Sequence, residues 1–136
     1  MKIKTLKFIL TFCIAIILLG CASTVNTTRT NYNFSPTPLS APIIVYGLTD
    51  TIPRNSQQIG TVRIGDSGFS VNCDWEQVLE KAKNACRKMG GNGIQIIDVS
   101  EPNFWLSTCY RLYVYTWKIP EKEYIEKLAE KQYIQK

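Results

Sequence analysis

The stretch DWEQVLEKAKNACRKMGGNGIQIIDV, residues 74–99, decides the fold that the sequence predicts. Asp74 can act as the N-cap of a helix, and Gln77 three residues later has the spacing of a capping box. Apolar residues recur at three- and four-residue spacing on one stripe: Trp75, Val78, Leu79, Ala82, Cys86 and Met89. Gly90-Gly91 follows where a left-handed cap residue is expected. The pattern therefore predicts an amphipathic helix, a tight turn and a strand over 93–99.

Apolar runs on both sides of this unit predict the rest of a sheet. Strands are expected over 43–46, 58–64 and 110–119, and Pro120 precedes a charged, weakly amphipathic helix over 121–136. The element order is β-β-α-β-β with an added C-terminal helix. We therefore expect an α+β fold of two layers, in which one sheet packs on one helix. The expected boundaries are 41–119 for the α+β domain and 120–136 for the charged C-terminal helix.

A targeting signal occupies the start of the chain. Three lysines precede the apolar run 8–19, which is shorter than the roughly 20 residues that span a bilayer as a helix. The run ends in Leu18-Leu19-Gly20-Cys21, which resembles the lipobox of bacterial lipoproteins. The resemblance implies a signal peptide over 1–20 and lipidation of Cys21, whose two or more acyl chains would form a stable membrane anchor. The alternative is an N-terminal anchor helix that contains Cys21 by coincidence.

The residues after Cys21 predict a location and a tether. Ala22 and Ser23 follow the cysteine in place of an aspartate, which in lipoproteins of the enterobacterial type implies sorting to the outer membrane. We expect a lipid-anchored protein on the periplasmic side of that membrane. Residues 21–40 are rich in Ser, Thr, Asn and Pro without an apolar period, which predicts a polar tether. The alternative is that Tyr32 and Phe34 pack onto the domain as a first strand.

Charge and composition exclude several classes of function. Removal of residues 1–20 takes away three of the 16 basic residues and none of the 11 acidic ones, so the net charge falls from +5 to +2. This charge gives no electrostatic footprint for nucleic acid. The chain has no histidine, which excludes Ser-His-Asp and Cys-His catalysis and histidine-bearing zinc sites. We expect no enzymatic activity, no catalytic residue, no metal site and no cofactor.

Three cysteines remain after the signal peptide and the lipidation site. The compartment outside the inner membrane is oxidising, so a disulfide is expected with one thiol left over. Cys86 lies on the apolar stripe of the helix, where a small hydrophobic residue belongs. Cys73 precedes the helix and Cys109 precedes the last strand, which favours a Cys73–Cys109 bridge. The alternative is that all three are reduced core residues.

A family resemblance covers residues 57–115. Its elements are Cys73, a helix that ends in Cys86-Arg87-Lys88-Met89, the segment 90–94, and Cys109-Tyr110-Arg111. Together they resemble the core of the RcsF family of outer-membrane stress-sensor lipoproteins, and the Gly-x-Asn-x-Ile part is similar to the YbjQ-like small α/β proteins. In the RcsF family the cysteine before the helix bridges the cysteine of the Cys-Tyr-Arg element, which implies Cys73–Cys109 here. This chain departs from that family in its odd cysteine, its shorter tether and its C-terminal helix.

Two surfaces are candidates for contact with a partner. The loop 101–107 places Phe104 and Trp105 between two strands, and aromatic residues on loops are common in binding sites. The alternative is that these rings pack around the disulfide. The last strand carries Arg111, Tyr113, Tyr115 and Trp117 on one face. We expect Tyr124, Ile125 and Leu128 of the C-terminal helix to cover that face, and the alternative is an exposed binding surface.

The sequence therefore predicts a lipid-anchored, non-catalytic interaction or stress-sensing module of the cell envelope. Its expected partners are the membrane, through the acyl chains on Cys21, and an envelope protein. The alternative is a small-ligand or metal-binding envelope lipoprotein of the YbjQ-like kind. In that case only Cys86, if reduced, would offer a ligand for a soft metal.

Overall fold

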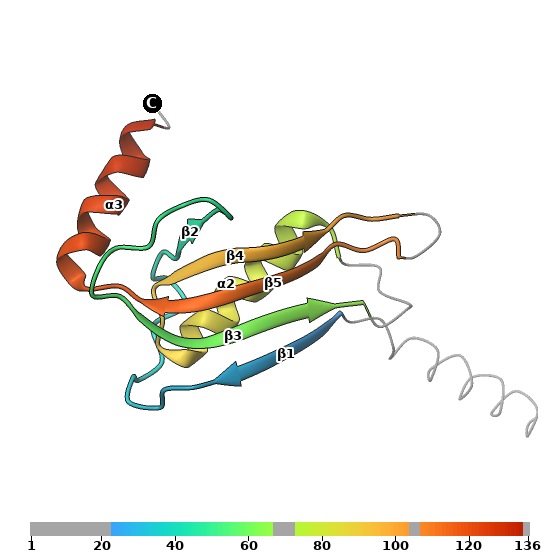
Figure 1. Cartoon of the computed structure of the whole chain (residues 1–136), viewed down its shortest axis with the longest axis horizontal. Coiled ribbons are helices and arrows are strands. Elements are labelled where there is room, and N and C mark those ends of the chain that lie inside the picture. The colour runs from blue at the N-terminus through green and yellow to red at the C-terminus, as the bar shows by residue number, and fades with distance from the viewer. Residues whose placement is uncertain (1–22, 67–72, 104–106, 135–136) are drawn as a thin grey trace, which may run out of the picture.

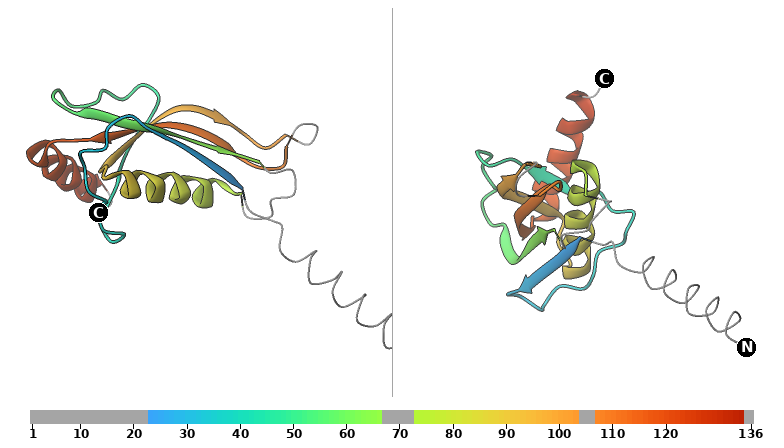
Figure 2. Two further views of the ribbon diagram at one scale, coloured as in Figure 1. Left: turned by 90° about the horizontal axis from the view of Figure 1, so that it is seen from below. Right: turned by 90° about the vertical axis from the view of Figure 1, so that its right-hand side faces the viewer.

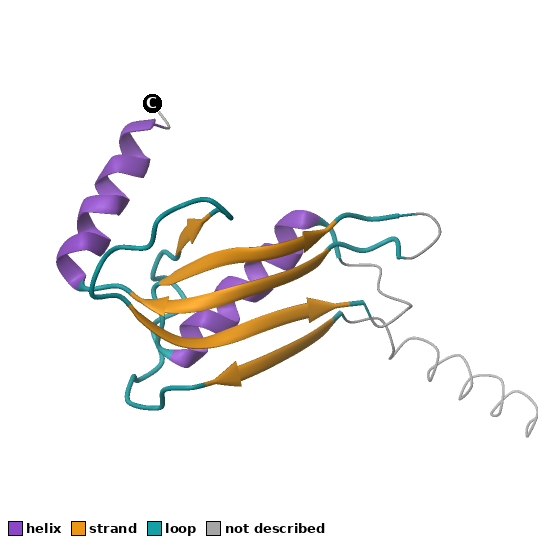
Figure 3. Cartoon of the chain, viewed as in Figure 1, coloured by secondary structure: helices purple, strands orange, loops and turns teal. Residues whose placement is uncertain are grey.

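The computed structural model describes residues 23–66, 73–103 and 107–134. Within these residues the chain is α+β, with a five-stranded mixed sheet and two helices (Figures 1 and 3). The elements are β1 (Thr24–Arg29), β2 (Ile44–Tyr46), β3 (Gln57–Gly65), α2 (Trp75–Met89), β4 (Gly93–Ser100), β5 (Arg111–Lys118) and α3 (Glu121–Ile134). Neither of these helices is long and apolar enough to cross a membrane.

The sheet has the strand order β1-β3-β5-β4-β2. All neighbouring strands are antiparallel except β2 and β4, which run parallel. Every predicted strand and helix is present, with ends that differ by about one or two residues, as helix and strand ends commonly do. The predicted β-β-α-β-β arrangement is nevertheless incomplete, because β1 adds a fifth strand at the edge beside β3.

The polar segment before β2 is packed on the domain, and the prediction of a tether over 21–40 is wrong for its described part. β1 pairs with β3 from Thr24 opposite Gly65 to Arg29 opposite Gly60. The side chain of Phe34 packs against the core, whereas Tyr32 is 75% exposed. β1 shows no apolar period because its side chains are largely exposed. Backbone hydrogen bonds to β3 hold β1 in the sheet, and such bonds produce no pattern of polar and apolar residues in the sequence.

Helix α2 begins and ends as its sequence predicts. The side chain of Asp74 accepts a hydrogen bond from the Gln77 backbone N–H at 2.9 Å. Gly90 is the C-cap, with a left-handed φ of 87°. A Cβ on Gly90 would also lie 2.5 Å from the Ser35 carbonyl oxygen. The glycine therefore both ends the helix and lets the N-terminal segment approach it closely.

The core lies between α2 and one face of the sheet. Figure 2 shows α2 beneath the sheet, with its apolar stripe toward β1, β3, β4 and β5. The largest fully buried side chains of this layer include Ile59, Ile64, Val78, Ile94, Leu112 and Val114. A smaller cluster of Ile44, Tyr46 and Ile119, joined by Ile52, Trp117, Tyr124 and Leu128, connects α3 to the edge of the sheet at β2.

Candidate interaction face

The sheet face opposite α2 carries a row of side chains that we call the open face. In the strand register, Arg63 on β3 and Asp98 on β4 both lie opposite Tyr113 on β5. Tyr115 lies two residues further along β5 on the same face. Among the described residues, no helix packs on this part of the sheet, since α2 covers the other face and α3 contacts β2.

Aromatic and cationic groups of the open face are held against one another. The Arg63 guanidinium lies 5.2 Å from the centre of the Tyr113 ring, which is the geometry of a cation–π contact. The Tyr113 and Tyr115 rings meet edge to face, with centres 5.7 Å apart. Both tyrosines are half-buried and Arg63 is exposed. These contacts hold the three side chains in place without a partner, and the side chains remain accessible to solvent.

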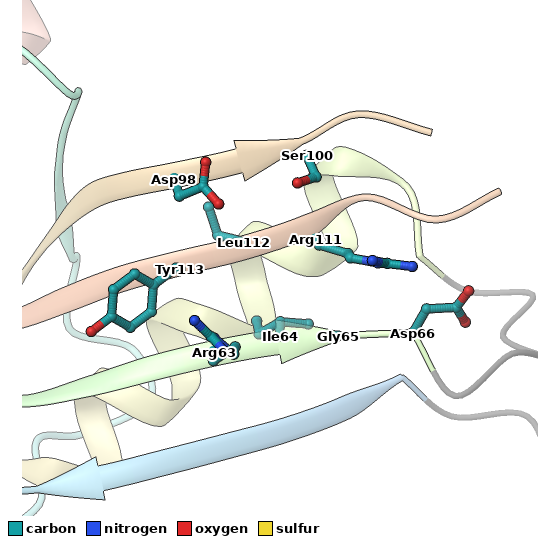
Figure 4. Close-up of a pocket in the computed structure, with 9 residues that line it drawn as sticks. All are labelled: Arg63, Ile64, Gly65, Asp66, Asp98, Ser100, Arg111, Leu112 and Tyr113. Carbon is teal, nitrogen blue, oxygen red and sulfur yellow. The ribbon is translucent and has the colours of Figure 1, made fainter. Parts of the chain in front are cut away.

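A shallow hollow of about 480 Å³ opens at one end of this face. Figure 4 shows its polar lining, in which Arg63, Arg111, Asp66 and Asp98 come from three neighbouring segments of the sheet. Ser107 donates a hydrogen bond to Asp66 Oδ2 at 2.7 Å. In the described part of the chain, no carboxylate lies within 4.0 Å of either guanidinium group. The hollow thus presents two guanidinium groups that form no ion pair with a described residue, beside two carboxylates.

The C-terminal helix covers less of the open face than the sequence predicts. Tyr124 and Leu128 pack in the cluster that includes Trp117, but Tyr113 and Tyr115 do not belong to it. Ile125 is 57% exposed. The prediction is therefore wrong for the two tyrosines. The two tyrosines stay uncovered because α3 turns from the end of β5 toward β2 and does not run back along β5.

A disulfide joins Cys73 to Cys109, as predicted. The bridge connects the start of α2 to the start of β5, with a Cα–Cα distance of 5.1 Å. Cys109 is 1% exposed, and the rings of Trp75 and Tyr110 meet edge to face beside it, 5.8 Å apart. The disulfide therefore links the start of α2 covalently to the start of β5, at the end of the sheet where the hollow opens.

Cys86 is the free cysteine among the described residues, and it is completely buried. Its thiol donates a hydrogen bond to the Gly93 carbonyl oxygen at 3.3 Å. Burial raises the pKa of this thiol to about 12. The thiolate, which is the nucleophile and the metal ligand, is therefore almost absent at neutral pH.

Several residues that the sequence singles out lie outside the described residues. These are the lipidation site Cys21 with the signal peptide 1–20, and the two loop residues Phe104 and Trp105. Sequence reasoning also missed two residues of the open face, Arg63 and Asp98. The available signal was alternation, because each is a charged residue between two apolar neighbours in a predicted strand.

The fold and the candidate site define a small α+β domain with one disulfide and one sheet face that its described helices leave open. Comparison with known proteins returns no match to a protein-family model, to a curated protein or to a solved structure.

Proposed function

We propose that this protein is a lipid-anchored, non-catalytic interaction module of the cell envelope, which contacts a protein partner through the open face. One observation carries the proposal. Arg63 is stacked on Tyr113 in an ordered aromatic row on a sheet face that no described helix covers. Arginine and tyrosine are the residues that most often supply binding energy at protein interfaces. A stacked guanidinium also loses little side-chain freedom when it binds.

The proposed location rests on the sequence and is consistent with the disulfide. The Leu-Leu-Gly-Cys ending of the signal segment supports diacylation of Cys21 and attachment to the outer membrane, facing the periplasm. A structural disulfide such as Cys73–Cys109 persists in oxidising compartments and is rare in the cytosol. Stress sensing of the RcsF kind is the specific role that we propose for such a module, on the strength of the Cys73 and Cys109-Tyr110-Arg111 resemblance.

The alternative, a metal-binding protein of the YbjQ-like kind, loses its one thiol ligand. Cys86 is buried with a pKa of about 12, so it offers no accessible thiolate to a soft metal. The hollow beside Arg111 is shallow and lined by both signs of charge, which suits a protein or headgroup surface better than a deep ligand cavity.

Position-specific crosslinking in intact envelopes tests this proposal. A photoreactive phenylalanine analogue replaces Tyr113 on the open face or Lys88, which is exposed on α2. We expect an adduct with a defined envelope protein from position 113 and none with that protein from position 88, as mass spectrometry identifies it. Arg63→Ala should lower the adduct yield about tenfold, the effect of removing one interface contact worth about 1.4 kcal/mol.

The same experiment separates the open face from the predicted loop. If Phe104→Ser with Trp105→Ser abolishes the adduct while Arg63→Ala leaves it unchanged, the partner binds through the loop. Equal adduct yields from positions 113 and 88 would contradict the proposal for the open face.

A further inference from the structure

The proposed lipid anchor joins the domain with almost no intervening chain. Ser23 is buried against α2, where Lys81 donates a hydrogen bond to its hydroxyl. β1 begins at the next residue, Thr24. Cys21 precedes Ser23 by two residues, so their Cα atoms lie no more than about 7 Å apart, whatever the conformation of Ala22. An acylated Cys21 would therefore hold the domain directly against the leaflet.

The attachment point fixes which end of the domain faces the lipid. Thr24 lies opposite Gly65 at the end of β3, and Ser100 lies opposite Arg111 where β4 ends and β5 begins. The Cys73–Cys109 disulfide lies at this same end, because Cys109 precedes the start of β5 by two residues; we call it the anchor end. α3 lies at the other end of the sheet (Figure 1). The eight residues of β5 are joined by seven steps of about 3.3 Å, so α3 starts roughly 23 Å or one strand length from the anchor end.

The anchor end has the chemistry of a surface that meets phospholipid headgroups. The Arg111 side chain extends from the start of β5 toward Asp66 at the end of β3 (Figure 4). The described residues place no carboxylate within 4.0 Å of the Arg111 guanidinium, which leaves it able to form paired hydrogen bonds with a phosphate. Carboxylates stand in the same hollow, at Asp66 and Asp98. Adjacent charges of both signs complement a headgroup that carries a phosphate and an ammonium.

We propose that the anchor end contacts the phospholipid headgroups. The strands of the sheet would then run away from the leaflet surface, with no free linker between the leaflet and the domain. This inference rests on the proposed lipidation of Cys21. The occupant of the surface is the zwitterionic headgroup layer, because the short connection from Cys21 brings this end to within reach of the headgroups of the leaflet that holds the acyl chains. The Tyr113–Tyr115 row then lies within a strand length of the membrane, and α3 lies at the opposite end of the sheet.

Distance-dependent quenching in vesicles tests this orientation. The full acylated protein is reconstituted in phosphatidylethanolamine–phosphatidylglycerol vesicles that contain a lipid with a nitroxide on its headgroup. A fluorophore is attached through a noncanonical amino acid at Thr108 of the anchor end or at Glu126 of α3, both of which are exposed. We expect the nitroxide to quench the label at 108 several-fold more strongly than the label at 126.

Two controls make the outcomes distinct. A Gly-Ser spacer of about 20 residues between Ala22 and Ser23 gives the domain a flexible reach of about 25 Å, and it should remove the difference between the two labels. A difference that persists with the spacer would overturn the role given to the short connection. Mass spectrometry of the N-terminal peptide comes first: a Cys21 without acyl chains refutes the proposed function and this inference together. Equal quenching of the two labels on acylated protein refutes this inference alone.

Discussion

Cys86 illustrates at the scale of one residue how burial limits chemistry. The sequence places it on the apolar stripe of the helix, and the structure buries it completely beneath β4 and β5. Because burial raises the pKa of the thiol to about 12, its neutral form is the stable one in the folded protein. The unfolded chain releases this proton near pH 9. The stability that comes from the neutral buried thiol is therefore present below pH 9 and declines as the pH rises toward about 12.

The native protein should not react with a thiol reagent at pH 8. After unfolding without a reductant, the acylated mature chain should titrate one thiol, that of Cys86, because the other two thiols of the domain form the disulfide. Absorbance with a chromogenic disulfide reagent measures both values. Rapid reaction of the native protein would contradict the burial of Cys86, and three thiols after unfolding would contradict the disulfide.

Two residues of the turn after α2 show what local sequence can and cannot predict. Gly90 as a helix cap follows from its place after an apolar stripe. The role of Asn92 does not, because its side chain donates to the Ile119 carbonyl oxygen at 2.9 Å and accepts from the Ile119 N–H at 2.7 Å. These partners are 27 positions away, and no local pattern indicates them.

At the scale of elements, Arg87 fastens the N-terminal segment to α2. Its side chain is 9% exposed. The Nε atom donates to the Ala41 carbonyl oxygen at 3.0 Å, and Nη1 donates to Glu80 at 3.0 Å and to Asn84 at 2.7 Å. The Arg87 carbonyl oxygen in turn accepts from the Thr37 N–H at 2.8 Å. Arg87 thus holds Thr37, in a segment that the sequence predicts to be a free tether, through its backbone, and Ala41, just after that segment, through its side chain.

We expect Arg87→Ala to lower the free energy of unfolding by about 2–3 kcal/mol, since hydrogen bonds from a charged and largely buried group are lost. The exposed neighbour Lys88→Ala should change it by less than about 0.5 kcal/mol. Urea denaturation followed by circular dichroism measures both. Equal effects of the two substitutions would show that the segment is not fastened through Arg87.

The ion pair between Arg87 and Glu80 makes the stability of the protein depend on pH. Partial burial raises the pKa of Glu80, but the hydrogen bond from Arg87 and the charges of Lys83 and Arg87 outweigh it, so the pKa is lowered. A lowered pKa contributes stability above the usual carboxyl range, and this contribution is lost as the pH falls through it. Because Glu80 is exposed, the effect is small, and Arg87→Ala should reduce it.

At the scale of the whole molecule, the disulfide links the two layers at the anchor end. Cys73 and Cys109 are 36 positions apart, and closing such a loop stabilises a fold by about 3.8 kcal/mol in the chain-entropy model. Cys73→Ser combined with Cys109→Ser should lower the melting temperature by about 15–30 °C, at about 4–8 °C per kcal/mol for a domain of this size. Thermal unfolding followed by circular dichroism measures the shift.

A reductant provides the matched control for this prediction. It should lower the melting temperature of the parent protein by a similar amount and leave that of the double variant unchanged. A parent protein that melts at the same temperature with and without reductant would show that the bridge contributes nothing to stability.

The sequence by itself determined the local elements: α2 with its caps, β4 and β5, and the break at Pro120. These depend on interactions between residues a few positions apart, and such interactions leave periodic or capping patterns. Only the tertiary structure decided that residues 24–29 form an edge strand, that α3 turns toward β2, and that Arg63, Asp98 and Tyr113 share an open face. The edge strand and the open face depend on pairing between distant strands through backbone hydrogen bonds, which are the same for every residue type and therefore leave no signal in composition. The direction of α3 depends on side-chain contacts with residues about 80 positions away, such as the hydrogen bonds from Tyr124 to the Pro42 carbonyl oxygen and from Lys131 to the Val45 carbonyl oxygen.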